Sequence, residues 1–142
     1  MKELLNIAAL FLLSSLFMRC DEETEKLFNY VLVTVNLTAV VHEGEHDGNP
    51  LSDEEVRLLI VKDGGERIDE IGVTDADGTT SALGTFKLYK EQPIEACVSL
   101  VELPDNYSCE TITWQVVDAG ATESGGERRY TWNVTLSLVY PL

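Results

Sequence analysis

Two long segments alternate between apolar and polar residues, one near the start of the chain and one at its end. Residues 30–41 are YVLVTVNLTAVV, and residues 130–140 are YTWNVTLSLVY. Side chains two positions apart share a face of a β-strand, so each segment predicts a strand with one buried face. The positions predicted to face the core are Val31, Val33, Val35, Leu37, Ala39, Val41, Tyr130, Trp132, Val134, Leu136, Leu138 and Tyr140.

Shorter apolar segments lie between these two and are separated by Asp-, Asn-, Gly- and Pro-containing turn signals. The segments predict further strands at 56–62, 66–74, 84–90, 93–102 and 107–117. About seven strands at short intervals are typical of a sandwich. We therefore expect an all-β fold, an antiparallel seven-stranded β-sandwich with a prealbumin-like or immunoglobulin-like Greek-key topology.

The segment 56–62 also permits a helix, because residues 52–55 (SDEE) form a capping box in front of it. Its β-branched residues and the turn signals at both ends favour a strand. No other part of the chain after the first 28 residues predicts an amphipathic helix. In the core itself, Trp114 and Trp132 are expected to contribute the largest buried side chains.

The N-terminal segment has the pattern of an export signal. Lys2 precedes an uncharged apolar run at 4–18, which is shorter than the about 20 residues of a membrane-spanning helix. Cys20 and three acidic residues at 21–23 follow this run. The arrangement resembles a bacterial lipoprotein signal, and that resemblance implies Cys20 as the lipid attachment site. Arg19 stands where such signals carry a small residue, so an uncleaved signal anchor stays open as an alternative.

These patterns divide the chain into three parts. Residues 1–19 are the expected signal peptide, 20–28 an acidic tether and 29–142 the β-sandwich domain. The acidic residues after Cys20 also resemble the export tag of Gram-negative surface lipoproteins. The expected location is therefore the outer membrane or the cell surface, with the membrane contacted through the N-terminal lipid.

The charge of the chain excludes one class of partner. The 25 acidic residues outnumber the 10 basic ones, which gives a formal net charge of −15. Such a protein repels nucleic acid phosphates and anionic lipid headgroups. We therefore expect no nucleic-acid partner.

Two motifs in the middle of the chain resemble a known type of domain. Residues 48–51 are GNPL, residues 74–78 are TDADG, and Phe86 follows in an aromatic strand. Together they resemble the transthyretin-like, carboxypeptidase regulatory-like β-sandwich modules. The resemblance implies a β-sandwich that serves as a binding or spacing unit without catalysis, and it is poorly specific for function.

Residues 42–46 (HEGEH) match the letters of the zinc-protease motif H-E-x-x-H. That motif needs both histidines on one face of a helix, whereas here it follows a predicted strand and contains Gly44. His42 and His46 are also the only histidines of the chain. We therefore predict a solvated polar loop and no metal site, with an adventitious divalent metal at the His42–His46 loop as the alternative.

No other group of residues predicts a catalytic or cofactor site. Asp75 and Asp77 with Gly78 begin like a calcium loop, but Phe86 stands where the bidentate glutamate is required. A tight turn explains these residues without a metal. A serine nucleophile elbow and a glycine-rich phosphate loop are both missing from the sequence. We expect no catalytic residue and no cofactor.

Cys97 and Cys109 lie in consecutive predicted strands on either side of the turn at 103–106. Alternation places both side chains away from the apolar face, and a slightly wide loop would pair them directly. In an exported protein such a pair favours a disulfide over two free thiols.

These observations predict an exported, lipid-anchored β-sandwich that is a non-catalytic binding or structural module at the cell surface or periplasm. Its expected partner is a protein or a glycan of the cell envelope. Two alternatives stay open: a metal-binding protein or metal-dependent enzyme that uses the His42–His46 loop, and an accessory subunit of an envelope transport or assembly complex.

Overall fold

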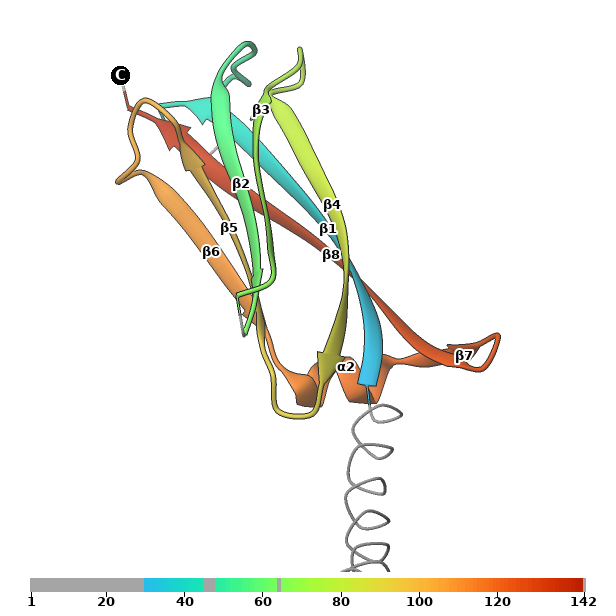
Figure 1. Cartoon of the computed structure of the whole chain (residues 1–142). Coiled ribbons are helices and arrows are strands. Elements are labelled where there is room, and N and C mark those ends of the chain that lie inside the picture. Colours follow the sequence, from blue (N-terminus) through green and yellow to red (C-terminus); the bar gives the residue numbers. More distant parts are fainter. Residues whose placement is uncertain (1–29, 45–47, 64, 142) are drawn as a thin grey trace, which may run out of the picture. The chain divides into compact units, whose positions relative to one another are not determined.

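A computed structural model describes residues 30–44, 48–63 and 65–141. Most of these residues lie in strands, and the strands form two sheets that face each other (Figure 1). The predicted all-β sandwich is therefore confirmed. The predicted signal peptide, the lipid attachment site Cys20 and the acidic tether lie outside the described residues, as does His46. Within the described residues, no helix is long and apolar enough to cross a membrane.

The first sheet has the strand order β4-β1-β8-β7. Its two long members are β1 (Tyr30–Glu43) and β8 (Glu127–Tyr140), flanked by β4 (Thr79–Tyr89) and the short β7 (Thr122–Ser124). β1 and β8 pair in parallel along twelve residues, from Leu32 opposite Arg129 to Glu43 opposite Tyr140. This pair departs from the fully antiparallel arrangement that the sequence predicts. A long connection and no hairpin joins β1 to β8, and such a connection allows parallel strands.

The second sheet has the strand order β3-β2-β5-β6 and is antiparallel throughout. It consists of β2 (Glu55–Lys62), β3 (Arg67–Val73), β5 (Ile94–Leu100) and β6 (Tyr107–Ile112). The segment 56–62 is thus a strand, as its β-branched residues predict. Asp53, within the alternative capping box, has a φ of 62° and is not helical.

The core lies between the two sheets and is built from alternate residues of their strands. All six predicted inward positions of β1 are fully buried. β2 and β5 contribute in the same way from the opposite sheet, with Val56, Leu58, Ile60, Ile94, Ala96, Val98 and Leu100. In the first sheet, Val134, Leu136 and Leu138 of β8 are buried beside the residues of β1, whereas Tyr130, Trp132 and Tyr140 are only partly buried.

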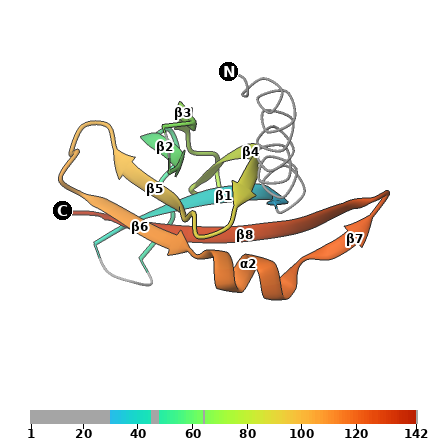
Figure 2. The ribbon, with the colours of Figure 1, turned by 60° about the horizontal axis from the view of Figure 1, so that its bottom comes forward.

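One prediction of secondary structure is wrong. Residues after Ile112 do not continue as a strand but form the short helix α2 (Trp114–Gly120), which follows β6 at one end of the sandwich (Figures 1 and 2). The helix buries Trp114 and Val117, which are three residues apart and share one helical face. Val116, which would share a face with Trp114 in the predicted strand at 107–117, is 51% exposed.

The helix packs against the beginning of β8 at Gly120. A Cβ at this position would lie 2.6 Å from Cε1 of Tyr130, so only a glycine allows the ring to lie this close to the helix. The contact explains why Tyr130 is partly buried although it lies near the beginning of β8. It also keeps the end of the core covered between the two sheets.

Candidate binding surface

The outward side of the sheet β3-β2-β5-β6 carries a mixture of apolar, charged and disulfide-bonded side chains. Its residues are the strand positions that alternate with the buried ones. We call this surface the outer face, and it comprises Arg67, Asp69, Ile71, Val73, Glu55, Arg57, Leu59, Val61, Glu95, Cys97, Ser99, Tyr107, Cys109 and Thr111.

Cys97 and Cys109 lie directly opposite each other in the β5–β6 pair. They form a disulfide with an S–S distance of 2.04 Å and a Cα–Cα distance of 4.1 Å. The predicted disulfide and its direct register are confirmed. The bond ties the edge strand β6 to β5, and closing a loop of this size typically stabilises a protein by about 2–4 kcal/mol.

An ion pair crosses the same face beside the disulfide. Arg57 donates two hydrogen bonds to the carboxylate of Asp69, at 2.9 Å from Nε and 2.6 Å from Nη2. These bonds are the main reason why the pKa of Asp69 lies below its ordinary value. In the register of the sheet, Arg57 lies opposite Ile71 on one side and opposite Ser99 on the other, and Tyr107 follows beyond Ser99. Ile71 and Tyr107 are strongly exposed, at 62% and 65%. Arginine and tyrosine with exposed aliphatic groups are favoured residues of protein interfaces.

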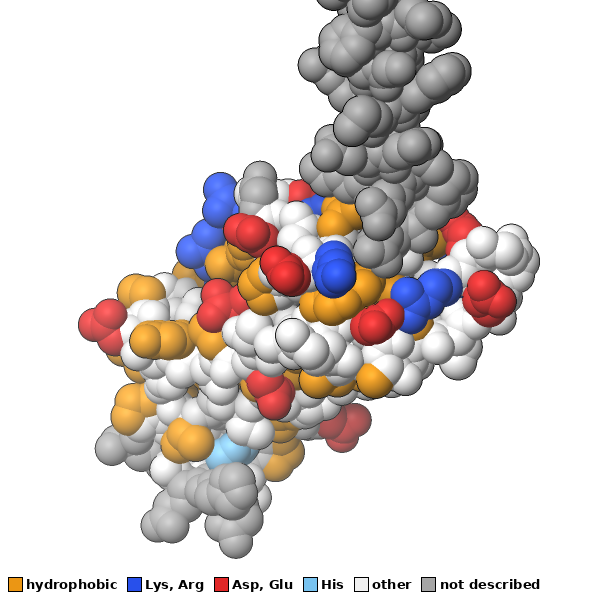
Figure 3. All heavy atoms as spheres, turned by 90° about the horizontal axis from the view of Figure 1, so that it is seen from below, with side chains coloured by type: hydrophobic (Ala, Val, Ile, Leu, Met, Phe, Trp, Pro, Cys, Tyr) orange, Lys and Arg blue, Asp and Glu red, His pale blue; other side chains and the backbone are white. Residues whose placement is uncertain are grey.

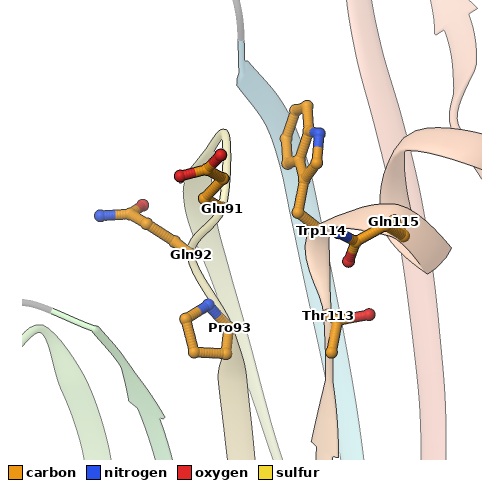
Figure 4. A pocket seen from close by; sticks show the side chains of 6 residues that line it. All are labelled: Glu91, Gln92, Pro93, Thr113, Trp114 and Gln115. Carbon is orange, nitrogen blue, oxygen red and sulfur yellow. The ribbon is translucent and has the colours of Figure 1, made fainter.

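Two shallow hollows lie at the end of this face that is nearer α2. The larger, about 360 Å³, is lined by Glu91, Gln92, Pro93, Thr113, Trp114 and Gln115. Figure 4 shows the β4–β5 turn on one side of it and the beginning of α2 on the other. The smaller, about 280 Å³, is lined by Val61, Asp63, Pro93, Glu95 and Thr111. Pro93 borders both hollows, so together they continue the outer face towards the helix.

The turn beside the larger hollow is fixed by its own side chains. Oε1 of Gln92 accepts a hydrogen bond from the backbone N–H of Tyr89 at 3.0 Å, and Glu91 has a φ of 69°. Across the hollow, Trp114 is 8% exposed, so little of its side chain is open to a partner. On this end of the molecule acidic, basic and hydrophobic side chains are interspersed (Figure 3). The surface therefore fits a partner with both polar and apolar groups.

The sequence contains a weak signal for the helix beside this hollow, but the period-two pattern of the same residues outweighs it. Trp114 and Val117 have helical spacing, and Thr113 precedes them as a residue type that often caps helices. Thr113 is indeed the N-cap residue, with extended φ and ψ of −104° and 164°, although its side chain makes no capping hydrogen bond. Because Ile112, Trp114 and Val116 also fit a period of two, the strand pattern dominated the prediction.

The prediction that His42 lies in a polar loop is wrong. His42 and Glu43 form the end of β1, and His42 is only 6% exposed. The chain then turns at Gly44, whose φ is 66°, and returns beside β1, where the N–H of Glu43 donates to the carbonyl of Asn49 at 3.0 Å. The first two residues of the H-E-x-x-H letters are therefore extended and not helical. That geometry does not provide the helical face that a zinc protease needs.

The motif 74–78 forms a turn that is closed by Asp75. Its Oδ1 accepts hydrogen bonds from the backbone N–H groups of Asp77 at 2.9 Å and Thr79 at 3.0 Å. These bonds, with that from the Thr79 N–H first, hold the pKa of Asp75 below its ordinary value. The predicted turn is confirmed, since the backbone N–H of Gly78 also donates to the carbonyl of Asp75 at 2.9 Å.

The two motifs that carry the family resemblance meet at the end of β1. Buried Thr74 donates its hydroxyl hydrogen to the carbonyl of Leu51 at 2.7 Å, and Val41 donates its N–H to the carbonyl of Gly78 at 2.8 Å. Gly78 has a φ of 77°, and a Cβ there would lie 2.6 Å from the carbonyl oxygen of Val41 and 2.9 Å from Cβ of Pro50. These motifs therefore have a structural role, namely to hold the loop after β1 against the β3–β4 turn.

Comparisons with known proteins leave the family of this chain open. No protein-family model matches it, and the search of curated proteins found no match. A solved structure with some likeness is described as the dioxygenase domain of a novel dioxygenase carbohydrate-binding protein fusion from the cellulolytic bacterium Streptomyces sp. SirexAA-E. It is 16% identical, with 74% of this chain and 80% of that chain covered and a TM-score of 0.39. At this TM-score the likeness carries no argument about function.

Proposed function

We propose that this protein is an exported, lipid-anchored β-sandwich that binds a protein or glycan partner at the cell envelope and catalyses no reaction. The observation that carries the proposal is the disulfide between Cys97 and Cys109, because such bonds persist in oxidising compartments and are rare in the cytosol. It agrees with the export-type N-terminal sequence that ends at Cys20. The lipid on Cys20 would hold the sandwich at the outer membrane or the cell surface.

The outer face is the proposed binding surface. Its exposed Ile71 and Tyr107 supply apolar contact area, and the Arg57–Asp69 pair supplies polar groups that are already oriented. A rigid sheet with a disulfide at its edge loses little conformational freedom when a partner binds. An accessory role in an envelope transport or assembly complex would use the same surface.

Mass spectrometry of the N-terminus tests the anchoring. Protein extracted from membranes of the native cells should begin at Cys20 and carry a diacylglyceryl group on its sulfur. The variant Cys20→Ser should leave the membrane fraction, whereas Cys109→Ser should remain in it. An unmodified Met1, or a soluble mature form of the unaltered protein, would contradict the proposal.

Cross-linking on intact native cells tests the binding surface. The full lipoprotein should yield a defined cross-linked partner, and Tyr107→Ala with Ile71→Ala should reduce its yield at least about tenfold, as interface anchors do. The control is Thr131→Ala with Thr135→Ala, which changes exposed residues on the other sheet. If both double variants reduced the cross-linking yield equally, the partner would not bind specifically to the outer face, and the proposal would be refuted.

A further inference from the structure

Three side chains of the outer face bring metal-binding atoms together. Glu95, Cys97 and Cys109 each offer one ligand atom, and these atoms all lie within 4.8 Å of one another. Glu95 and Cys97 are two residues apart on β5 and so share a face, while Cys109 lies opposite Cys97 on β6. The combination of two sulfurs and one carboxylate is a ligand set that suits zinc and other thiophilic divalent ions.

The disulfide determines whether these atoms are available. In the oxidised protein the two sulfurs are bonded to each other at 2.04 Å, and neither is a thiolate. Reduction by a dithiol cleaves the S–S bond: two electrons and two protons pass to the cysteines, and the reductant becomes a disulfide. Two thiols then stand on paired strands, and each loses its proton when a metal ion binds.

The strand geometry fits the reduced site. Two thiolates on one tetrahedral zinc ion, each at about 2.3 Å, stand about 3.8 Å apart. The Cα atoms of Cys97 and Cys109 are 4.1 Å apart, so rotation of the side chains can provide this separation while the strands stay paired. Glu95 and Cys109 are exposed, so solvent reaches the site and a water molecule can supply the fourth ligand.

We propose that reduction of the Cys97–Cys109 disulfide creates a binding site for a thiophilic divalent metal ion such as Zn²⁺, formed by both cysteines and Glu95. The site lies on the surface, since Glu95 and Cys109 are exposed and Cys97 is partly exposed, so both a reductant and a metal ion can reach it. This proposal goes beyond the proposed function and does not depend on it.

Zinc titration of the full chain in both redox states tests the proposal. The protein carries Cys20→Ser, so that the two strand cysteines are its remaining thiols, and a chromophoric chelator competes for Zn²⁺ after the reductant has been removed. The reduced protein should bind one ion at least about 100-fold more tightly than the oxidised protein does. The oxidised sample measures any zinc bound elsewhere, including by His42 and His46.

Two carboxylate variants show whether Glu95 is a ligand. Glu95→Gln should weaken zinc binding by the reduced protein about tenfold or more. Glu110→Gln serves as the matched control, because it removes an exposed carboxylate next to Cys109 on the opposite side of β6, and its affinity should stay within about twofold of the parent. Cobalt(II) loaded in place of zinc should show a thiolate-to-metal absorption band and tetrahedral d–d bands.

Three results would overturn the proposal. These are equal zinc affinity in the two redox states, unchanged affinity in Glu95→Gln, and loss of the strand signal in circular dichroism on reduction, because an unfolded chain has no assembled site. The variant Cys109→Ser separates folding from metal ligation. Its circular dichroism should equal that of the reduced parent, whereas its cobalt thiolate band should be weaker because one of the two sulfur ligands is missing. The lipid and cross-linking experiments use the oxidised protein, so a failure there leaves this test unaffected.

Discussion

β1 and β8 are equally long, carry the same alternating pattern and pair with each other in parallel, but the structure buries them to different extents. Every inward residue of β1 from Val31 to Val41 is fully buried. Of the six inward residues of β8, three are buried and three, Tyr130, Trp132 and Tyr140, are only partly buried. Alternation thus identified the inward face of both strands correctly. It did not predict how deeply each inward side chain is buried.

The difference follows from the position of each strand in its sheet. β1 lies between β4 and β8, so it has a hydrogen-bonded neighbour on both sides. β7 pairs with β8 only at Glu127, Arg128 and Arg129. Beyond Arg129, β8 therefore has only β1 beside it among the described strands of its sheet. At such an edge the bulky Tyr130, Trp132 and Tyr140, which lie towards the two ends of β8, are only partly covered, whereas the smaller inward residues between them are buried.

Among the substitutions that compare β1 with β8, Leu37→Ala should cause the largest loss of stability. Leu37 is fully buried at the centre of β1, and truncating such a leucine costs about 2–5 kcal/mol, a large part of a typical stability of about 5–15 kcal/mol. Denaturant unfolding of the oxidised protein measures the loss. A cost below about 1 kcal/mol would mean that the centre of β1 is not the centre of the core.

Trp132→Ala should cost less than Leu37→Ala despite the larger side chain that is removed. Trp132 is only partly buried, so its truncation removes less contact with the core, and we expect about 1–3 kcal/mol. Its expected role as one of the largest contributors to the core is therefore corrected by the position of β8. Unfolding both variants under one condition tests the order, and a larger loss for Trp132→Ala would contradict the edge-strand explanation.

The sequence predicted those features that local patterns specify. Period-two alternation identified the buried face of β1, and the Asp-Gly signals located the connection between β2 and β3 and the turn at 75–78. Spacing around the turn at 103–106 paired Cys97 with Cys109. Pairing order was not accessible in this way, because the parallel contact of β1 with β8 joins segments almost 100 residues apart.

The candidate binding surface shows the same limit. Arg57 and Asp69 come from different strands and meet only because β2 pairs with β3 in one register. The residues around Trp114 fit the spacing of a strand and that of a helix. The segment is a helix in the folded protein, where Trp114 packs in the core. The sequence predicts a loop at His42 because Gly44 favours a turn, but pairing with β8 extends β1 through Glu43.

The end of β1 should depend on pH through Asp75. Its turn holds Gly78 in place to accept the hydrogen bond from Val41, and the turn's own N–H groups lower the pKa of the Asp75 carboxyl. A carboxyl with a lowered folded pKa stabilises the protein above its unfolded pKa, which is about 3.9, and that contribution is lost as the pH falls through the folded value. Asp75→Asn should thus be less stable than the parent at pH 7, and the difference should shrink below about pH 4.

The comparison needs a control that separates Asp75 from other acidic residues. Asp69 also has a lowered pKa, but its main partner is Arg57 on the outer face of the other sheet. Asp69→Asn should therefore leave amide hydrogen exchange at the end of β1 unchanged, whereas Asp75→Asn should speed it at Val41. Equal exchange at Val41 in both variants would show that the turn does not hold this end of the strand.

Thr131→Ala and Thr135→Ala should have the smallest effects, and they test the face assignment of β8 directly. Both residues are exposed and alternate with the inward residues Trp132 and Val134. Surface substitutions of this kind usually change stability by no more than about 0.5 kcal/mol, although threonine favours strands slightly more than alanine does. Thermal unfolding beside Trp132→Ala gives the measurement. If Thr135→Ala collapsed while Trp132→Ala melted like the parent, the inward and outward faces of β8 would be exchanged, and its register with β1 would shift by one residue.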